Sequence, residues 1–182
     1  MLTTAKGPLV PGQDVVWTGF SAWVTAGGDV DCIHNALSGE LTVNSAGKDK
    51  GLVSSATSTG TQRGPEGEET LCENHTLFGA ARVTWSGLPF AAEYTTKGAA
   101  VLKGTKKIVM TQEFPYTEET KCVYETAKVS STFKVGGPME PSTSQVFSVN
   151  TKVSNAGCPR SGTWEANWTV FSNGELVESE LQ

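Results

Sequence analysis

Apolar and polar residues alternate along most of this chain, which is the pattern of β-strands that bury one face. The segment 164–170 is the clearest example, because Trp164, Ala166, Trp168 and Val170 fall on the same side of an extended backbone. No apolar stripe at the helical period lasts for three turns, and the abundant Thr, Ser and Gly suit solvated strand faces and tight turns. The alternation therefore predicts an all-β fold.

Turn signals separate the alternating segments, among them Gly27-Gly28-Asp29 and Ser172-Asn173-Gly174. Together they predict about nine or ten strands with two disulfides, arranged as an antiparallel β-sandwich or barrel. Because 182 residues suit one fold of this kind, residues 1–182 are expected to form a single domain. The other predicted strands are 15–24, 37–43, 81–85, 90–95, 107–111, 122–124, 127–135 and 146–153.

Composition limits the kinds of partner this chain can have. The net charge is −5 and the 14 Lys and Arg are scattered, so a nucleic-acid partner is not expected. No stretch approaches the roughly 20 consecutive apolar residues of a membrane-spanning helix. Five Trp, seven Phe and three Tyr require a packed core, which argues against disorder.

The four cysteines, Cys32, Cys72, Cys122 and Cys158, indicate an oxidising compartment. None lies in a Cys-x-x-Cys pair, which weakens zinc and redox interpretations and favours two long-range disulfides in a secreted, extracellular protein. The first residues have neither the charged start nor the apolar core of a signal peptide. We hypothesise that Met1 stands in place of a removed export signal.

Residues 15–95 and 100–175 show a weak internal duplication. In each half a cysteine precedes an alternating strand, and the next cysteine leads into a strand that bears a tryptophan. Four cysteines allow three pairings, and the duplication favours one bridge within each half. The favoured bridges are Cys32–Cys72 and Cys122–Cys158.

The segment 54–69 interrupts the strand pattern, because it consists mainly of Ser, Thr, Gly and Glu. We expect a long exposed loop here, and such loops are uncommon unless they are functional or mobile. Two interpretations stay open: a surface excursion held by the cysteine that follows it, or a loop that binds a partner.

Three motifs carry a resemblance to a known group of proteins. They are Gly87-Leu88-Pro89-Phe90 after a Val-Thr-Trp strand, Cys122-Val123-Tyr124, and the run from Cys158-Pro159 to Val170. The chain resembles secreted actinobacterial proteins of unknown function, in which a Cys-Pro commonly precedes a Thr-Trp-x-Ala-x-aromatic-x-Val strand near the C-terminus. The resemblance implies an exported β-sandwich and no particular activity.

Few residues are candidates for catalysis or metal binding. The two histidines, His34 and His75, each closely follow a cysteine, so a bridge between those cysteines brings them together near Asp29, Asp31 and Glu73. Such a set resembles a metal or acid–base site, but two histidines without a third fixed ligand are incomplete. We therefore expect no metal and no cofactor, and no Gly-x-Ser-x-Gly elbow of a serine hydrolase is present.

Trp17, Phe20 and Trp23 recur every three residues in one predicted strand. We expect this spacing to divide the aromatic residues between both faces and to expose Trp17 or Trp23, where an indole can stack on a sugar ring. The alternative is a β-bulge that returns both indoles to the core.

These observations favour a secreted, non-catalytic binding or structural module that acts at the cell surface or in the extracellular medium. The candidate binding residues are Trp17, Trp23, His34 and His75. The candidate partners are an extracellular protein, a glycan or a second copy of this chain. Two alternatives stay open: an inhibitor or effector that acts on another protein through the 54–69 loop, and a hydrolase that uses the two histidines.

Overall fold

The computed structural model describes residues 1–47, 49–65, 67, 70–75, 78–117 and 120–180, and these residues form strands and no helix. Accordingly, no helix in the described part of the chain is long and apolar enough to cross a membrane. The strands are β1 (Leu2–Thr4), β2 (Gly7–Pro8), β3 (Asp14–Thr25), β4 (Gly28–Val43), β5 (Asp49–Thr59), β6 (Glu73–Asn74), β7 (Arg82–Ser86), β8 (Phe90–Thr95), β9 (Ala99–Phe114), β10 (Thr120–Thr132), β11 (Gly137–Pro138), β12 (Ser142–Val149), β13 (Ser161–Ser172), β14 (Glu175–Leu176) and β15 (Glu178–Ser179).

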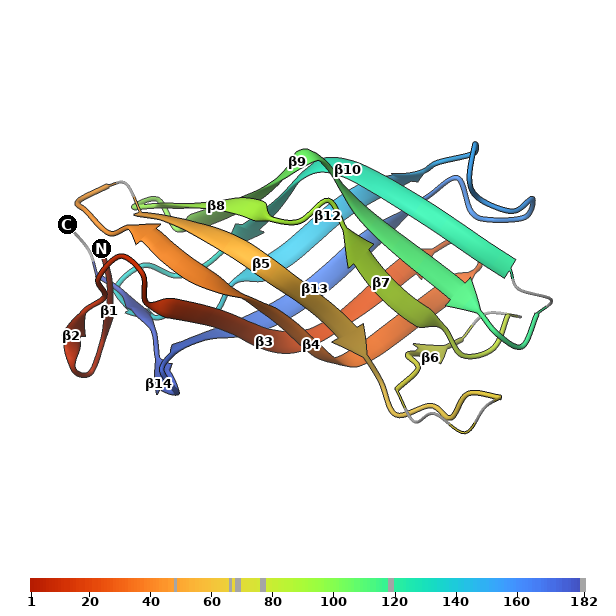
Figure 1. Cartoon of the computed structure of the whole chain (residues 1–182), viewed down its shortest axis with the longest axis horizontal. Coiled ribbons are helices and arrows are strands. Elements are labelled where there is room, and N and C mark those ends of the chain that lie inside the picture. Colours follow the sequence, from red (N-terminus) through yellow and green to blue (C-terminus); the bar gives the residue numbers. More distant parts are fainter. Residues whose placement is uncertain (48, 66, 68–69, 76–77, 118–119, 181–182) are drawn as a thin grey trace.

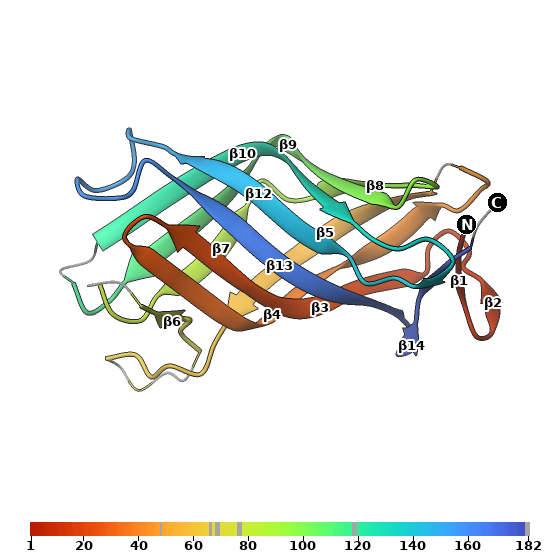
Figure 2. The ribbon, with the colours of Figure 1, turned by 180° about the vertical axis from the view of Figure 1, so that it is seen from behind.

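The long strands form a closed antiparallel barrel with eight strand positions (Figures 1 and 2). The order around the barrel is β3, β4, β5, β7 with β8, β9, β10, β12 and β13, and β13 pairs with β3 to close it. β7 and β8 share one position, because each pairs with β5 on one side and β9 on the other. The predicted all-β class is confirmed, and of the two predicted architectures the chain adopts a barrel in which consecutive strands are neighbours.

Side chains fill the interior of the barrel. Aromatic rings contact one another along its length, with centroid distances of 6.1 Å between Trp17 and Trp168, 5.8 Å between Trp168 and Trp164, and 4.9 Å between Trp164 and Trp85. Two internal cavities between the described residues hold only about 10 and 20 Å³. An eight-stranded barrel is just wide enough for side chains to fill, so the interior here is a packed core.

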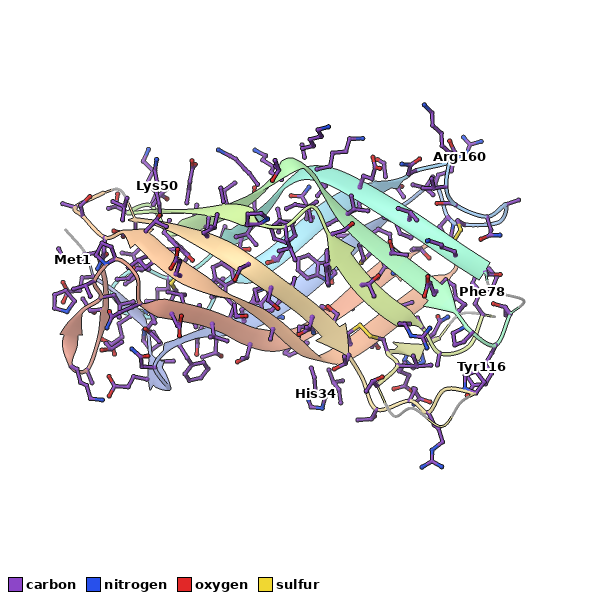
Figure 3. All side chains as sticks on the ribbon, in the orientation of Figure 1. Met1, His34, Lys50, Phe78, Tyr116 and Arg160 are labelled. Carbon is purple, nitrogen blue, oxygen red and sulfur yellow. A yellow bond between two sulfur atoms is a disulfide. The ribbon has the colours of Figure 1, made fainter. Side chains whose placement is uncertain are left out.

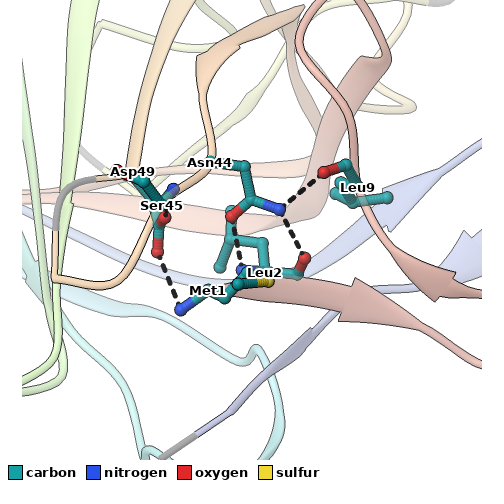
Figure 4. A network of polar contacts seen from close by, with 6 residues as sticks. All are labelled: Met1, Leu2, Leu9, Asn44, Ser45 and Asp49. Atoms are coloured by element: carbon teal, nitrogen blue, oxygen red, sulfur yellow. Dashed lines mark hydrogen bonds and ion pairs between the residues drawn. The ribbon is translucent and has the colours of Figure 1, made fainter. Parts of the chain in front are cut away.

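A small four-stranded sheet, β11-β15-β1-β2, lies at the barrel end where the two termini meet (Figure 1). Leu2, Met139 and Val177 are buried there and belong to the main core. Asn44 fixes the N-terminal segment, because its Oδ1 accepts from the Leu2 N–H at 2.8 Å while its Nδ2 donates to the carbonyls of Leu2 and Leu9 (Figure 4). The sheet therefore closes this end of the core.

The opposite end carries the long connections and both disulfides. Cys32 is bonded to Cys72 and Cys122 to Cys158, as the internal duplication predicted, and no described cysteine is free. The first bridge ties β4 to the segment that leads into β7, and the second ties β10 to the segment that leads into β13. Each bridge therefore anchors a long connection to the barrel wall.

Several strand boundaries differ from the sequence prediction, since 37–43 and 107–111 are parts of the longer β4 and β9, and 146–153 extends past the end of β12 at Val149. The predicted loop 54–69 begins too early, because residues 54–59 belong to β5, of which 55–59 pair with β4. The rest folds back on itself through the bridge between Gln62 and Leu71, and its positions 66, 68 and 69 lie outside the described residues. The predicted strands 122–124 and 127–135 are one strand, β10, with a register shift between Thr126 and Lys128.

Candidate functional site

An irregularity in the barrel wall breaks the alternation of β4. Gly19 of β3 pairs with Asn35, whereas Ser21, two residues later, pairs with Cys32, three residues earlier. Two residues of β4, Ile33 and His34, therefore face the single residue Phe20 of β3. This is a β-bulge, and it turns two successive side chains of β4 outward.

The side chain of Asn35 holds the bulge from inside. Asn35 is buried, its Nδ2 donates to the carbonyls of Cys32 at 2.6 Å and Gly19 at 3.3 Å, and its Oδ1 accepts from the Ser21 hydroxyl at 3.1 Å. The side-chain amide thus donates hydrogen bonds to backbone carbonyls at the point where the bulge interrupts the regular hydrogen bonding between β3 and β4. Gly19 is also required here, because a Cβ at this position would lie 1.9 Å from the carbonyl oxygen of Asn167 in β13.

Beside the bulge, the outer face of β13, β3, β4 and β5 is hollowed. One row of outward residues crosses the four strands as Thr169, Thr18, Ala36 and Thr57, whose register places them side by side. The next row, at the bulge, is bulkier and includes Phe20, Ile33, His34 and Thr59. The resulting hollow has a volume of about 580 Å³, and its lining residues are Thr18, Gly19, Phe20, Ile33, His34, Asn35, Ala36, Thr57, Thr59 and Thr169.

The side chains that line this hollow are apolar or polar, and they include one imidazole. Phe20 is 57% exposed and Ile33 is 50% exposed, so two large apolar side chains face solvent next to each other at the bulge. His34 projects from the outside of β4 (Figure 3). None of the ten lining residues is Asp, Glu, Lys or Arg. We refer to this surface as the outer hollow.

The expectation that Trp17 or Trp23 is exposed is wrong. Both indoles are buried, and their rings pack against Tyr94 and Tyr124 respectively. The two tryptophans are six residues apart, an even number, so a regular strand places them on the same face. Phe20 is an odd number of residues from each, and it is the aromatic residue that faces solvent.

The two histidines, which the sequence placed near one disulfide, belong to different surroundings. His34 lines the outer hollow, whereas Nε2 of His75 lies 3.3 Å from Oδ2 of Asp31. His75 and the carboxylates of Asp29 and Asp31 form a cluster whose donor atoms all lie within 4.8 Å of one another. Burial and then the Asp29 carboxylate raise the pKa of Asp31, while His75 opposes that shift.

Sequence reasoning did not single out Ile33, Asn35 or the threonine row as parts of a site. Phe20 lies three residues, an odd number, from both Trp17 and Trp23, and this spacing predicts that it faces the opposite side of the strand from the two indoles. The bulge itself has a weaker signal. Alternation from the core positions Val30 and Leu37 fails within β4, because the two residues are seven apart yet both buried.

Comparison with known proteins adds no relative to this description. No protein-family model matches the chain, and no curated protein or solved structure matches it. The fold and the geometry of the site are therefore the basis for a functional proposal.

Proposed function

We propose that this protein is a secreted, non-catalytic binding module, and that its outer hollow binds a neutral carbohydrate. The observation that carries the proposal is the β4 bulge, which turns Ile33 and His34 outward next to the exposed Phe20 of β3 and beside a row of small residues, three of which are threonines. Two disulfides, and the resemblance to secreted actinobacterial proteins, support an extracellular location.

The chemistry of the hollow suits a sugar ring. An exposed aromatic face offers a platform for the apolar face of a pyranose, and the hydroxyls of Thr18, Thr57 and Thr169 can donate to and accept from sugar hydroxyls. A lining without carboxylate, ammonium or guanidinium groups favours an uncharged ligand. The volume of about 580 Å³ lies within the range of small-ligand sites, roughly 300–1,000 Å³.

Binding to the outside of the wall also follows from the packed interior. The cavities inside the described barrel hold about 10 and 20 Å³, which is room for about one water molecule and far too little for a sugar. A hydrolase that uses both histidines has little support, because His34 and His75 lie among different neighbours.

The test is retention of the purified protein on an array of immobilised neutral oligosaccharides, followed by calorimetric titration with the best ligand. We expect Phe20→Ala to weaken binding about tenfold, since stacking on an aromatic ring contributes about 0.5–1.5 kcal/mol beyond its buried area. His34→Ala should also weaken binding. The matched control is Val146→Ala, which removes another exposed apolar side chain on β12, away from the hollow.

Two results would contradict the proposal. One is the absence of retention on any neutral oligosaccharide of the array. The other is equal affinity of the wild type and Phe20→Ala for the ligand, or a loss of affinity in Val146→Ala as large as that in Phe20→Ala. Either outcome would show that the outer hollow is not the binding surface.

A further inference from the structure

A second group of side chains, separate from the outer hollow, has the composition of a metal site. Asp29 and Asp31 lie two residues apart in β4 and therefore on the same side of the strand, and His75 follows β6. One donor atom from each lies within 4.8 Å of the other two. The group thus joins one imidazole nitrogen and two carboxylate oxygens from two distant segments of the chain.

The backbone beneath this group is fixed by several independent links. The disulfide Cys32–Cys72 holds the two segments with a Cα–Cα distance of 4.7 Å. β4 and β6 pair through Val30 with Asn74 and Asp31 with Glu73, and the His75 N–H donates to the Asp29 carbonyl at 2.9 Å. The three donors are therefore brought together by the fold before any ligand binds, which lowers the entropic cost of binding.

The distances suit a small divalent ion. In a tetrahedral zinc site, nitrogen and oxygen ligands at 2.0–2.2 Å from the metal lie about 3.3–3.6 Å from each other. Nε2 of His75 already lies 3.3 Å from Oδ2 of Asp31. The remaining pairs require a movement of no more than about 1.5 Å, which side-chain rotation of half-exposed residues can supply.

We propose that Asp29, Asp31 and His75 bind one divalent transition-metal ion of the zinc type. An imidazole ligand argues against Ca²⁺, which takes six to eight oxygen ligands. His75 is 49% exposed, so the fourth coordination position is open to water or to an oxygen of another molecule. The ion links β6 to β4 beside the disulfide, and the carboxylates of Asp29 and Asp31 supply the further ligands that a single histidine lacks.

This inference does not depend on the carbohydrate proposal, and its test is separate. The probe is ZnCl₂ in equilibrium dialysis at neutral pH, without chelator or reductant. The disulfides leave no thiol among the described cysteines to bind the metal. We expect one ion per chain in the wild type. His75→Gln and Asp31→Asn should each weaken binding at least about tenfold, since even residues that only orient a ligand cost 10–100-fold.

The matched control is His34→Gln, which removes the other histidine and should bind zinc as the wild type does. As a measurement that needs no variant, zinc added to the wild-type protein should shift the NMR ring signals of His75 and leave those of His34 unchanged. The proposal is overturned if the wild type binds no zinc. It is also overturned if His34→Gln loses as much affinity as His75→Gln, or if the His75 signals do not move.

Discussion

Trp168 is buried inside the barrel. Its ring contacts those of Trp17 and Trp164, and its Nε1 donates to Oγ1 of Thr143 at 3.2 Å. Because a packed core relaxes only partly around a deleted side chain, we expect Trp168→Ala to lower the free energy of unfolding by about 3–5 kcal/mol. Phe20→Ala, in the exposed hollow, should change it by less than about 0.5 kcal/mol. Denaturant titration measures both, and similar losses would contradict the assignment of inner and outer faces.

A second residue-scale prediction concerns pH. The hydrogen bond from Lys107 lowers the pKa of Glu125, burial partly opposes it, and the hydrogen bond from Asn150 lowers it further. A carboxyl group with a lowered folded pKa stabilises the fold above its unfolded pKa of about 4.3 and loses that contribution as pH falls through the folded value.

We therefore expect Glu125→Gln to be less stable than the wild type at neutral pH, by up to about 1 kcal/mol, as for other ion pairs near the surface. The difference should shrink as the pH falls through the lowered folded pKa, and it should vanish once the wild-type carboxyl group is protonated. Thermal unfolding at several pH values measures this, with Glu165→Gln on the exposed face of β13 as control. A difference that stays constant with pH would exclude the ionic contribution.

In a regular strand, odd and even positions face opposite sides, so the sequence predicts which side chains are buried. Trp164 and Trp168 are buried on one face as predicted, because β13 is regular along its whole length. Trp17 and Trp23 follow the same rule, so the prediction that one of them is exposed was an error in applying it. The proximity of His75 to Asp31 could be predicted through the Cys32–Cys72 bridge. The separate position of His34 could not, because it depends on the bulge between β3 and β4, which no local pattern identifies.

At the scale of elements, the bulge of β4 depends on one buried amide. Removing the Asn35 side chain leaves the carbonyls of Gly19 and Cys32 without their donor in the wall of the barrel. We expect Asn35→Ala to lower the free energy of unfolding by about 1–3 kcal/mol, the cost of leaving buried polar groups unpaired. It should also weaken any ligand binding to the outer hollow, because Ile33 and His34 lose their fixed position.

The matched control is Asn167→Ala, an exposed residue of the same type on the outer face of β13. It should change stability by less than about 0.5 kcal/mol. Chemical denaturation compares the two variants. Equal stability of Asn35→Ala and the wild type would show that the bulge does not need the amide.

The elements that sequence patterns missed have a common physical cause. In β5, the segment Ser54-Ser55-Ala56-Thr57-Ser58-Thr59 has small, polar residues on both faces, so it lacks the alternation that identifies a strand. Contacts with neighbouring strands make the segment a strand. Hydrogen bonds to β4 define its register, and the indole N–H of Trp85 donates to the Ser58 hydroxyl at 2.8 Å. Tertiary pairing overrides a weak local preference here.

At the scale of the whole molecule, the two halves place their cysteines alike. In each half, one cysteine lies in the second strand position, which is β4 or β10, and the other lies in the connection that leads to the fourth, which is β7 or β13. This regularity is why the pairing could be predicted from spacing alone. The closure of the barrel by β13 and β3 could not be, because strand counts alone are compatible with a sandwich.

The two halves share one core, so they should unfold together even when one bridge is removed. Trp85 of the first half contacts Trp164 of the second, and Trp23 of the first contacts Phe147 of the second. We expect the double variant Cys122→Ala, Cys158→Ala to lose about 2–4 kcal/mol of stability, since the bridge closes a chain segment with a sequence separation of 36. Its unfolding should still be one cooperative transition.

Tryptophan fluorescence and far-ultraviolet circular dichroism in guanidinium chloride measure this transition together. The two signals should coincide at a lower midpoint. The dependence of the unfolding free energy on denaturant should be equal or steeper than in the wild type, because an unfolded chain without the bridge exposes more surface. A shallower dependence, or separate transitions in the two signals, would show that the halves unfold independently and that residues 1–182 do not behave as a single domain.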